Sequence, residues 1–128
     1  MDKDLLVSGH DLVDLLIDSG MPLRVAMWVH NTDTDSWRLW VVPGPELSDK
    51  REFYRRIATV ISLNRDKLPN LTVADIELMS DKHPAITALG KLMRVPRGGD
   101  VQVTDNKLND YYLPNAVILL MELSGPSA

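Results

Sequence analysis

The chain has 128 residues, 45% hydrophobic and 25% charged, with a formal net charge of −4 at pH 7. This balance is typical of a folded domain and excludes a disordered chain. Cysteine is absent, which excludes disulfides, thiolate metal sites and cysteine nucleophiles. No apolar run is long enough to span a bilayer, and the acidic start lacks the pattern of a signal peptide. We therefore expect a cytoplasmic protein with no membrane contact, made of one domain over residues 1–123 and a short tail over residues 124–128.

The first predicted element is a helix over residues 3–18. Apolar residues recur at near-helical spacing, aspartates take the other face, and Gly20 with Pro22 ends the pattern. Gly9 inside the pattern leaves open a start after Ser8.

Two alternating segments, residues 23–30 and 37–42, follow and flank a turn-rich stretch over residues 31–36. This pattern predicts a β-hairpin. Its alternation puts Leu23, Val25, Met27 and Val29 on one face and Arg24, Ala26, Trp28 and His30 on the other.

The second half of the chain predicts a helix capped by Ser48 or Asp49 that ends before Pro69, and a helix opened by Pro84. Between them, residues 74–80 predict a short strand. Val101 begins another strand, residues 105–107 turn or bulge it, and residues 111–123 form a last strand buried on both faces. The order α-β-β-α-β-α-β-β favours an α+β or α/β domain. We expect a mixed sheet of about five strands with the helices mainly on one face.

Metal-binding patterns are incomplete. Asn31, Asp33 and Asp35 alternate like the start of a calcium loop, but Ser36 and Val42 stand where such a loop needs glycine and glutamate. A turn explains these residues more simply. The three histidines, at positions 10, 30 and 83, fall on different predicted elements and lack metal-ligand spacing. We predict a fold that needs no metal or cofactor.

The tryptophans of the hairpin suggest a binding surface. Trp28 shares a predicted face with Arg24 and His30, and tryptophan and arginine together are typical of binding hot spots. If Trp40 and Arg38 point the same way, the face holds two indoles that something should cover; burial as core is the alternative. From this face we predict a non-catalytic interaction module. We expect the chain either to form a homodimer that buries Trp28 and Trp40 or to bind another protein partner there.

Two other classes of function stay open. The first is a nucleic-acid-associated accessory protein, which would use a cluster of basic residues. Because Glu52 interrupts the cluster at helical spacing, we favour a solvated helix face and do not expect nucleic acid as a partner. The cluster consists of Lys50, Arg51, Arg55, Arg56, Arg94 and Arg97. The second is a small enzyme with a dispersed site, drawn from His30, Asp33, Asp75, Glu77 and His83.

Three segments carry a resemblance: residues 21–29, residues 37–40 and the run Tyr54-Arg55-Arg56-Ile57. With residues 101–104 and 115–118, they resemble a group of small uncharacterised bacterial α/β proteins that have no assigned activity. The resemblance covers most of the chain. It implies a single bacterial, cytoplasmic domain and implies nothing about chemistry.

Overall fold

The computed structural model describes residues 1–47 and 49–123, and in this part of the chain the predicted order of elements is confirmed. The fold is α+β, with three α-helices and a five-stranded mixed sheet within the described residues. The elements are α1 (Lys3–Asp18), β1 (Leu23–Asn31), β2 (Ser36–Pro43), α2 (Lys50–Leu63), the 3₁₀ helix η1 (Val73–Asp75), β3 (Ile76–Leu78), α3 (Pro84–Leu92), β4 (Val101–Leu108) and β5 (Tyr111–Met121).

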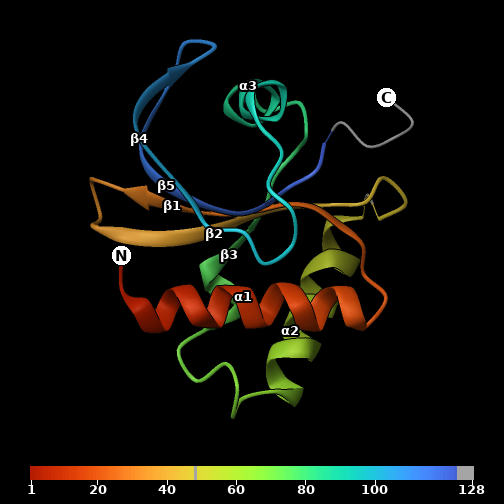
Figure 1. The fold of residues 1–128 in the computed structure, drawn as a ribbon. Coiled ribbons are helices and arrows are strands. Elements are labelled where there is room, and N and C mark those ends of the chain that lie inside the picture. The colour runs from red at the N-terminus through yellow and green to blue at the C-terminus, as the bar shows by residue number, and fades with distance from the viewer. Residues whose placement is uncertain (48, 124–128) are drawn as a thin grey trace.

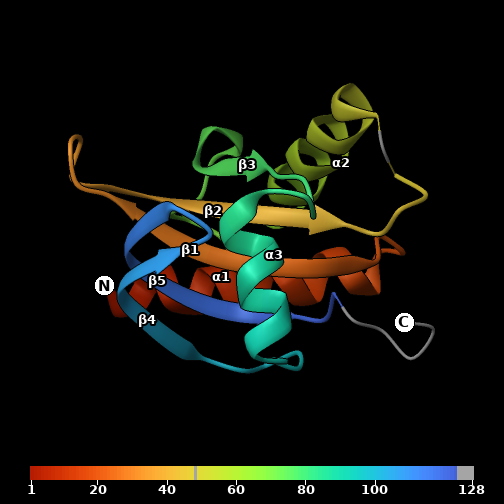
Figure 2. The same cartoon turned by 90° about the horizontal axis from the view of Figure 1, so that it is seen from above.

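The sheet has the strand order β3-β2-β1-β5-β4, in which β3 runs parallel to β2 and the other neighbours are antiparallel. Both faces of the sheet are covered: α1 and α2 lie on one side and α3 on the other (Figure 1). Seen from above, the β1–β2 hairpin extends beyond α3 (Figure 2). The two longer helices, α1 and α2, therefore cover one face of the sheet, and the nine-residue α3 covers the other.

Helix α1 spans the predicted range, so the alternative start after Ser8 is wrong. Asp2 caps it by accepting a hydrogen bond from the Asp4 amide at 2.9 Å, and Gly20, with φ +96°, ends the segment in the left-handed region. Gly9 is buried against the sheet, where a side chain would overlap the indole of Trp28. The glycine that weakened the helical pattern thus permits close approach of helix and sheet.

The other two helices begin where capping residues predict them. Asp49 accepts hydrogen bonds from the amides of Arg51 and Glu52 at the start of α2, while Ser48 lies outside the described residues. Pro84 opens α3, and the Nδ1 atom of the preceding His83 accepts a hydrogen bond from the Ala85 amide at 3.2 Å. Among the described residues, no helix has both the length and the apolar character needed to cross a membrane.

The register of the β1–β2 hairpin places Trp28 and Trp40 on opposite faces of the sheet. Trp28 pairs with Leu39, and Trp40 pairs with Met27. The prediction that one face of the hairpin carries both indoles is therefore wrong. Its physical reason is the loop between the paired residues Asn31 and Ser36, which sets the strands one residue away from the register that would align the indoles.

One further expectation about strand faces is wrong, and another is confirmed. Leu23 packs with Trp28 rather than with Val25, because the β1–β2 register shifts between Leu23 and Val25. The apolar residues of β5 are buried from both faces, as predicted, and a second irregularity falls opposite the Ala26–Met27 step of β1.

The boundaries near the C-terminus differ from the sequence prediction. Strand β4 continues through residues 105–107 to Leu108, with a local irregularity at Asp105, whose φ is 49°. The turn is made by Asn109 and Asp110, with φ of 49° and 66°. Two successive residues at positive φ are typical of the tight turns that close β-hairpins. The strand expected over residues 74–80 contracts to β3 after a turn of 3₁₀ helix, and the last strand ends at Met121 rather than residue 123. The predicted tail, residues 124–128, lies outside the described residues.

Candidate functional site: an aromatic pocket on the α3 face

Two cavities are lined by residues that the sequence analysis singled out as candidates for binding or catalysis. The larger has a volume of about 420 Å³, and we call it the aromatic pocket. It lies on the sheet face that carries α3. Its lining residues are Val29, His30, Asn31, Thr32, Asp33, Arg38, Trp40, Glu77, Tyr111, Tyr112, Leu113 and Pro114.

The aromatic rings of this pocket belong to a cluster that surrounds the start of α3. The ring centroids of Trp40 and Tyr111 are 6.2 Å apart, and His83 lies 5.0 Å from Trp40 and 4.7 Å from Tyr111. All three pairs meet edge to face, the arrangement that the charge distribution of aromatic rings favours. Burial lowers the pKa of His83 below its usual value, and the carboxylate of Glu77 partly opposes that effect. His83 therefore supports the cluster as a neutral ring.

Charged side chains form the opposite wall. Arg38 on β2 contacts Glu77 on β3 through a single Nη1–Oε1 distance of 3.5 Å, and their side chains are 54% and 41% exposed. At the tip of the β1–β2 hairpin, the His30 ring packs against Trp37 on the sheet face that carries Trp28, and its Nε2 lies 2.9 Å from Asp35 Oδ1. Charged groups thus stand at the rim with weak or exposed partners, so they are accessible to a ligand.

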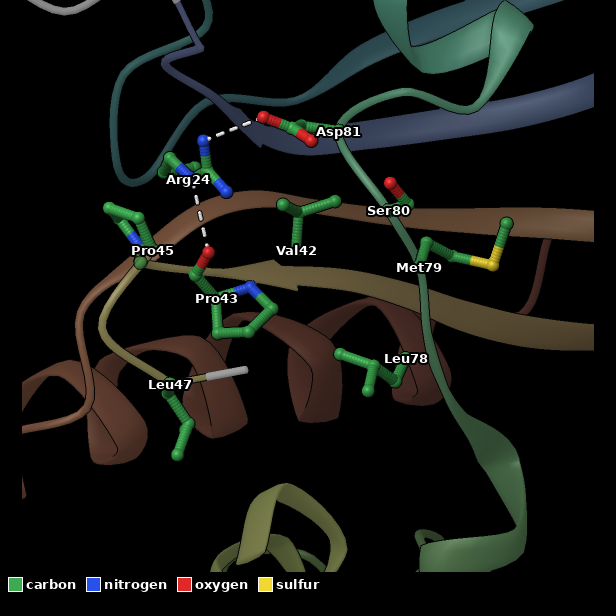
Figure 3. Close-up of a pocket in the computed structure, with 10 residues that line it drawn as sticks. Arg24, Val42, Pro43, Pro45, Leu47, Leu78, Met79, Ser80 and Asp81 are labelled. Carbon is green, nitrogen blue, oxygen red and sulfur yellow. Dashed lines mark hydrogen bonds and ion pairs between the residues drawn. The ribbon is translucent and has the colours of Figure 1, made fainter. Parts of the chain in front are cut away.

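The smaller cavity has a volume of about 370 Å³ and lies where β3 leaves the edge of β2; we call it the Arg24 pocket. Arg24 donates from Nε to the Pro43 carbonyl and from Nη1 to Asp81, each at 3.0 Å (Figure 3). The first bond satisfies a carbonyl at the end of the strand, and the second fixes the segment that leads to α3. Because both contacts have a structural use, Arg24 is a clamp rather than a ligand-binding group.

The five predicted interaction residues therefore do not form one surface. Arg38, Trp40 and His30 line the aromatic pocket, and Arg24 lines the other cavity. Trp28 is fully buried between the sheet and α1. Tyr111 and Tyr112, which the sequence reasoning missed, complete the pocket; their signal is a tyrosine pair directly after the Asn-Asp turn.

The basic residues nominated for nucleic acid are largely engaged by carboxylates. Arg55 and Arg56 both bind Glu52, and these hydrogen bonds lower the pKa of Glu52 to about 2. Arg94 binds Glu122 at 3.0 Å, and Arg97 binds Asp14 and Asp18 on α1. The carboxylates that bind Arg94 and Arg97 thus lie outside α2. Lys50 and Arg51, in the first turn of α2, are exposed. This pairing supports the interpretation of a solvated helix face.

Three of the five residues named for a dispersed enzyme site border the aromatic pocket: His30, Asp33 and Glu77. The His30 ring lies with Trp37 on the other sheet face, so it is not brought together with Glu77. Asp75 instead forms a capping box with Thr72, and His83 caps α3. The calcium-like stretch is a turn, because Asn31 Oδ1 accepts hydrogen bonds from the amides of Asp33 and Thr34. Within residues 1–47 and 49–123, no group of three His, Asp or Glu side chains is arranged to hold a metal ion.

No family model, curated protein or solved structure matches this chain.

Proposed function

We propose that the chain is a non-catalytic interaction module that recognises a segment of a partner polypeptide through the aromatic pocket. The observation that carries this proposal is the meeting of Trp40, Tyr111, Tyr112 and Arg38 around one cavity. Tryptophan, tyrosine and arginine are the residue types that dominate the energetics of protein interfaces. They come from β2 and β5, two strands that hydrogen bond to opposite sides of β1.

A partner polypeptide is favoured over the homodimer that the two tryptophans suggested. Trp28 is fully buried and Trp40 is only 7% exposed, so neither indole offers a large apolar surface to a second copy. A pocket open at the tip of a hairpin is suited instead to an inserted side chain. We retain an intracellular site of action as a prediction from composition.

Selection of random peptides displayed on phage tests the proposal. The full chain is the bait, and the double variant Tyr111→Ala/Tyr112→Ala removes two aromatic residues of the pocket. The double variant Arg55→Ala/Arg56→Ala is the matched control on α2. We expect clones that bind the wild type and the α2 control and that lose binding to the pocket variant. Clones that bind all three proteins equally, or a selection without enrichment, would reject the proposal.

A small enzyme is the second candidate, because His30, Asp33 and Glu77 line the same cavity. The contact between His30 and Asp35 is typical of a histidine oriented by a carboxylate for proton transfer. Turnover of chromogenic esters, phosphate esters or glycosides that disappears in His30→Gln would favour this candidate. Equal rates for the wild type and His30→Gln would reject it.

A further inference from the structure

Carboxylates outnumber cations around the aromatic pocket. Asp33 and Glu77 line it, and Arg38 is the single lysine or arginine among the lining residues. Beside the pocket, Asp105 accepts a 2.6 Å hydrogen bond from the Tyr112 hydroxyl, and Lys107, which pairs with Tyr112 across the strands, is balanced by Asp110 at 3.8 Å. The field at the pocket is therefore negative, and the net charge of −4 reinforces it at longer range.

The aromatic floor favours the same sign of ligand. The face of a phenol ring carries partial negative charge, so a cation near the face of the half-buried Tyr111 is attracted to it. An ammonium or guanidinium group on an alkyl stem also covers apolar surface with the stem, and the half-buried Pro114 and Tyr111 provide such surface. An anionic ligand would gain from Arg38 alone and would face the carboxylates.

Glu77 already holds a guanidinium group. Arg38 reaches it through one contact of 3.5 Å, while Glu77 Oε2 has no hydrogen bond or ion pair to any described residue. A second cation can therefore bind Glu77, because no bidentate ion pair has to be broken first. Arg38 and this second cation would share one carboxylate, so the charge of Arg38 weakens the binding of the second cation.

From these observations we infer that the aromatic pocket takes a lysine or arginine side chain of a basic partner segment. This inference rests on the proposed function and specifies the chemistry of the partner. It also gives Arg38 an unusual role: because Arg38 is a competing cation, removing its charge strengthens binding of the partner.

The experiment uses the full chain and two short peptide amides, one with two arginines and its match with two glutamates. The three tryptophans give three indole N–H resonances, which are assigned by single Trp→Phe variants. Trp40 reports on the pocket, and the fully buried Trp28 on the opposite face is the internal reference. We expect the arginine peptide to shift the Trp40 resonance and to leave the Trp28 resonance unchanged.

Three variants set the sign of the charge effect. Glu77→Gln should weaken binding of the arginine peptide about three-fold, and Arg38→Gln should strengthen it about two-fold, the range that exposed charge pairs allow. Arg56→Gln on α2 should change nothing. Unchanged thermal midpoints show that the variants remain folded.

Each alternative outcome has a distinct meaning. If the glutamate peptide binds more tightly and Arg38→Gln weakens it, the cation inference fails while the proposed function stands. If neither peptide shifts Trp40 at millimolar concentration, the inference fails, and the peptide selection decides the proposed function separately. If spermidine reproduces the shift and the affinity of the arginine peptide, the ligand is a free amine and the assignment to a partner segment is overturned.

Discussion

The two tryptophans of the central hairpin have opposite surroundings. Trp28 is fully buried, and its Nε1 atom is the one buried side-chain nitrogen or oxygen in the described part of the chain without a hydrogen-bond partner. Trp40 lies among His83, Tyr111 and the charged residues of a cavity. Since the two strands are neighbours, the difference arises from what covers each face. Two long helices fill the Trp28 face, whereas α3 is short and leaves part of the Trp40 face open.

This comparison shows how a sheet divides stability and binding between its faces. The Trp28 face tolerates an unpaired indole N–H, whose burial costs on the order of 1–3 kcal/mol, because the ring packs closely against α1. The Trp40 face keeps polar groups near solvent, where a partner can reach them. We therefore expect substitutions on the first face to change the free energy of unfolding and substitutions at the pocket to change binding.

The largest expected effect is that of Trp28→Ala. Truncating a fully buried tryptophan leaves a cavity that close packing cannot fill, and we expect the free energy of unfolding to fall by about 3–5 kcal/mol. Trp40→Ala should cost about 1–2 kcal/mol less, because water from the adjoining pocket can enter the space. Urea unfolding of both variants measures the difference. Equal losses would show that the two faces are packed alike.

The second prediction uses a glycine on each face. A Cβ at Gly9 would overlap the rigid indole of Trp28, so Gly9→Ala should destabilise the protein by about 1–3 kcal/mol despite its better helix propensity. Gly90 of α3 is the matched position, where the new methyl group would meet the flexible side chain of Leu123, whose Cδ1 atom would have to move and whose Cβ atom would be 3.3 Å away. Gly90→Ala should stay within about 0.5 kcal/mol of the wild type. A neutral Gly9→Ala would contradict the close approach of α1.

Local signals in the sequence predicted most of the fold. The spacing of apolar residues, the cap at Ser48 or Asp49, the Gly20–Pro22 stop and the helix-opening Pro84 each act within a few residues of the element they define, so they can be recognised without tertiary structure. The hairpin register could not be predicted, because residues 31–36 are all turn formers and permit several loop lengths. One residue of slippage exchanges the two faces, and this placed Trp40 beside Trp28 in the prediction.

The candidate site was harder to predict for the same reason. Arg38, Trp40 and His30 were nominated by residue type, but Glu77 and Tyr111 reach them through strand order, which no local pattern encodes. The face of the sheet that α3 covers could not be predicted either. A nine-residue amphipathic helix fits either face, and in the structure Ala85, Ile86 and Leu89 pack on the face that carries Trp40.

The third prediction compares the arginines of the two cavities. Arg24→Met removes a partly buried hydrogen bond to the Pro43 carbonyl as well as the contact with Asp81, and we expect a loss of about 1 kcal/mol in the free energy of unfolding. Arg38→Met removes one exposed contact, and we expect a change below about 0.5 kcal/mol. Urea unfolding at moderate salt tests both. A larger loss for Arg38→Met would make it structural and weaken its assignment to the pocket.

The smallest expected effect concerns pH and the start of α3. Burial lowers the folded-state pKa of His83, so the unfolded chain binds a proton more readily than the folded one. The stability that neutral His83 contributes is therefore fully present above the unfolded pKa of about 6.5 and is lost as the pH falls through the folded pKa. Protonation at Nδ1 would also remove the acceptor for the Ala85 amide.

His83→Asn isolates this contribution, because asparagine can cap the helix and does not titrate. We expect the free energy of unfolding of the wild type to fall more steeply than that of His83→Asn between about pH 7.5 and pH 5.5. This window lies above the titration of Glu52, whose lowered pKa withdraws its own contribution only at pH below about 4.5. The matched control is Thr59→Ala on the exposed side of α2, which should keep the pH dependence of the wild type. Identical slopes for the wild type and His83→Asn would mean that His83 gains or loses its proton equally well in the folded and unfolded chain, and the aromatic cluster would then not depend on a neutral ring.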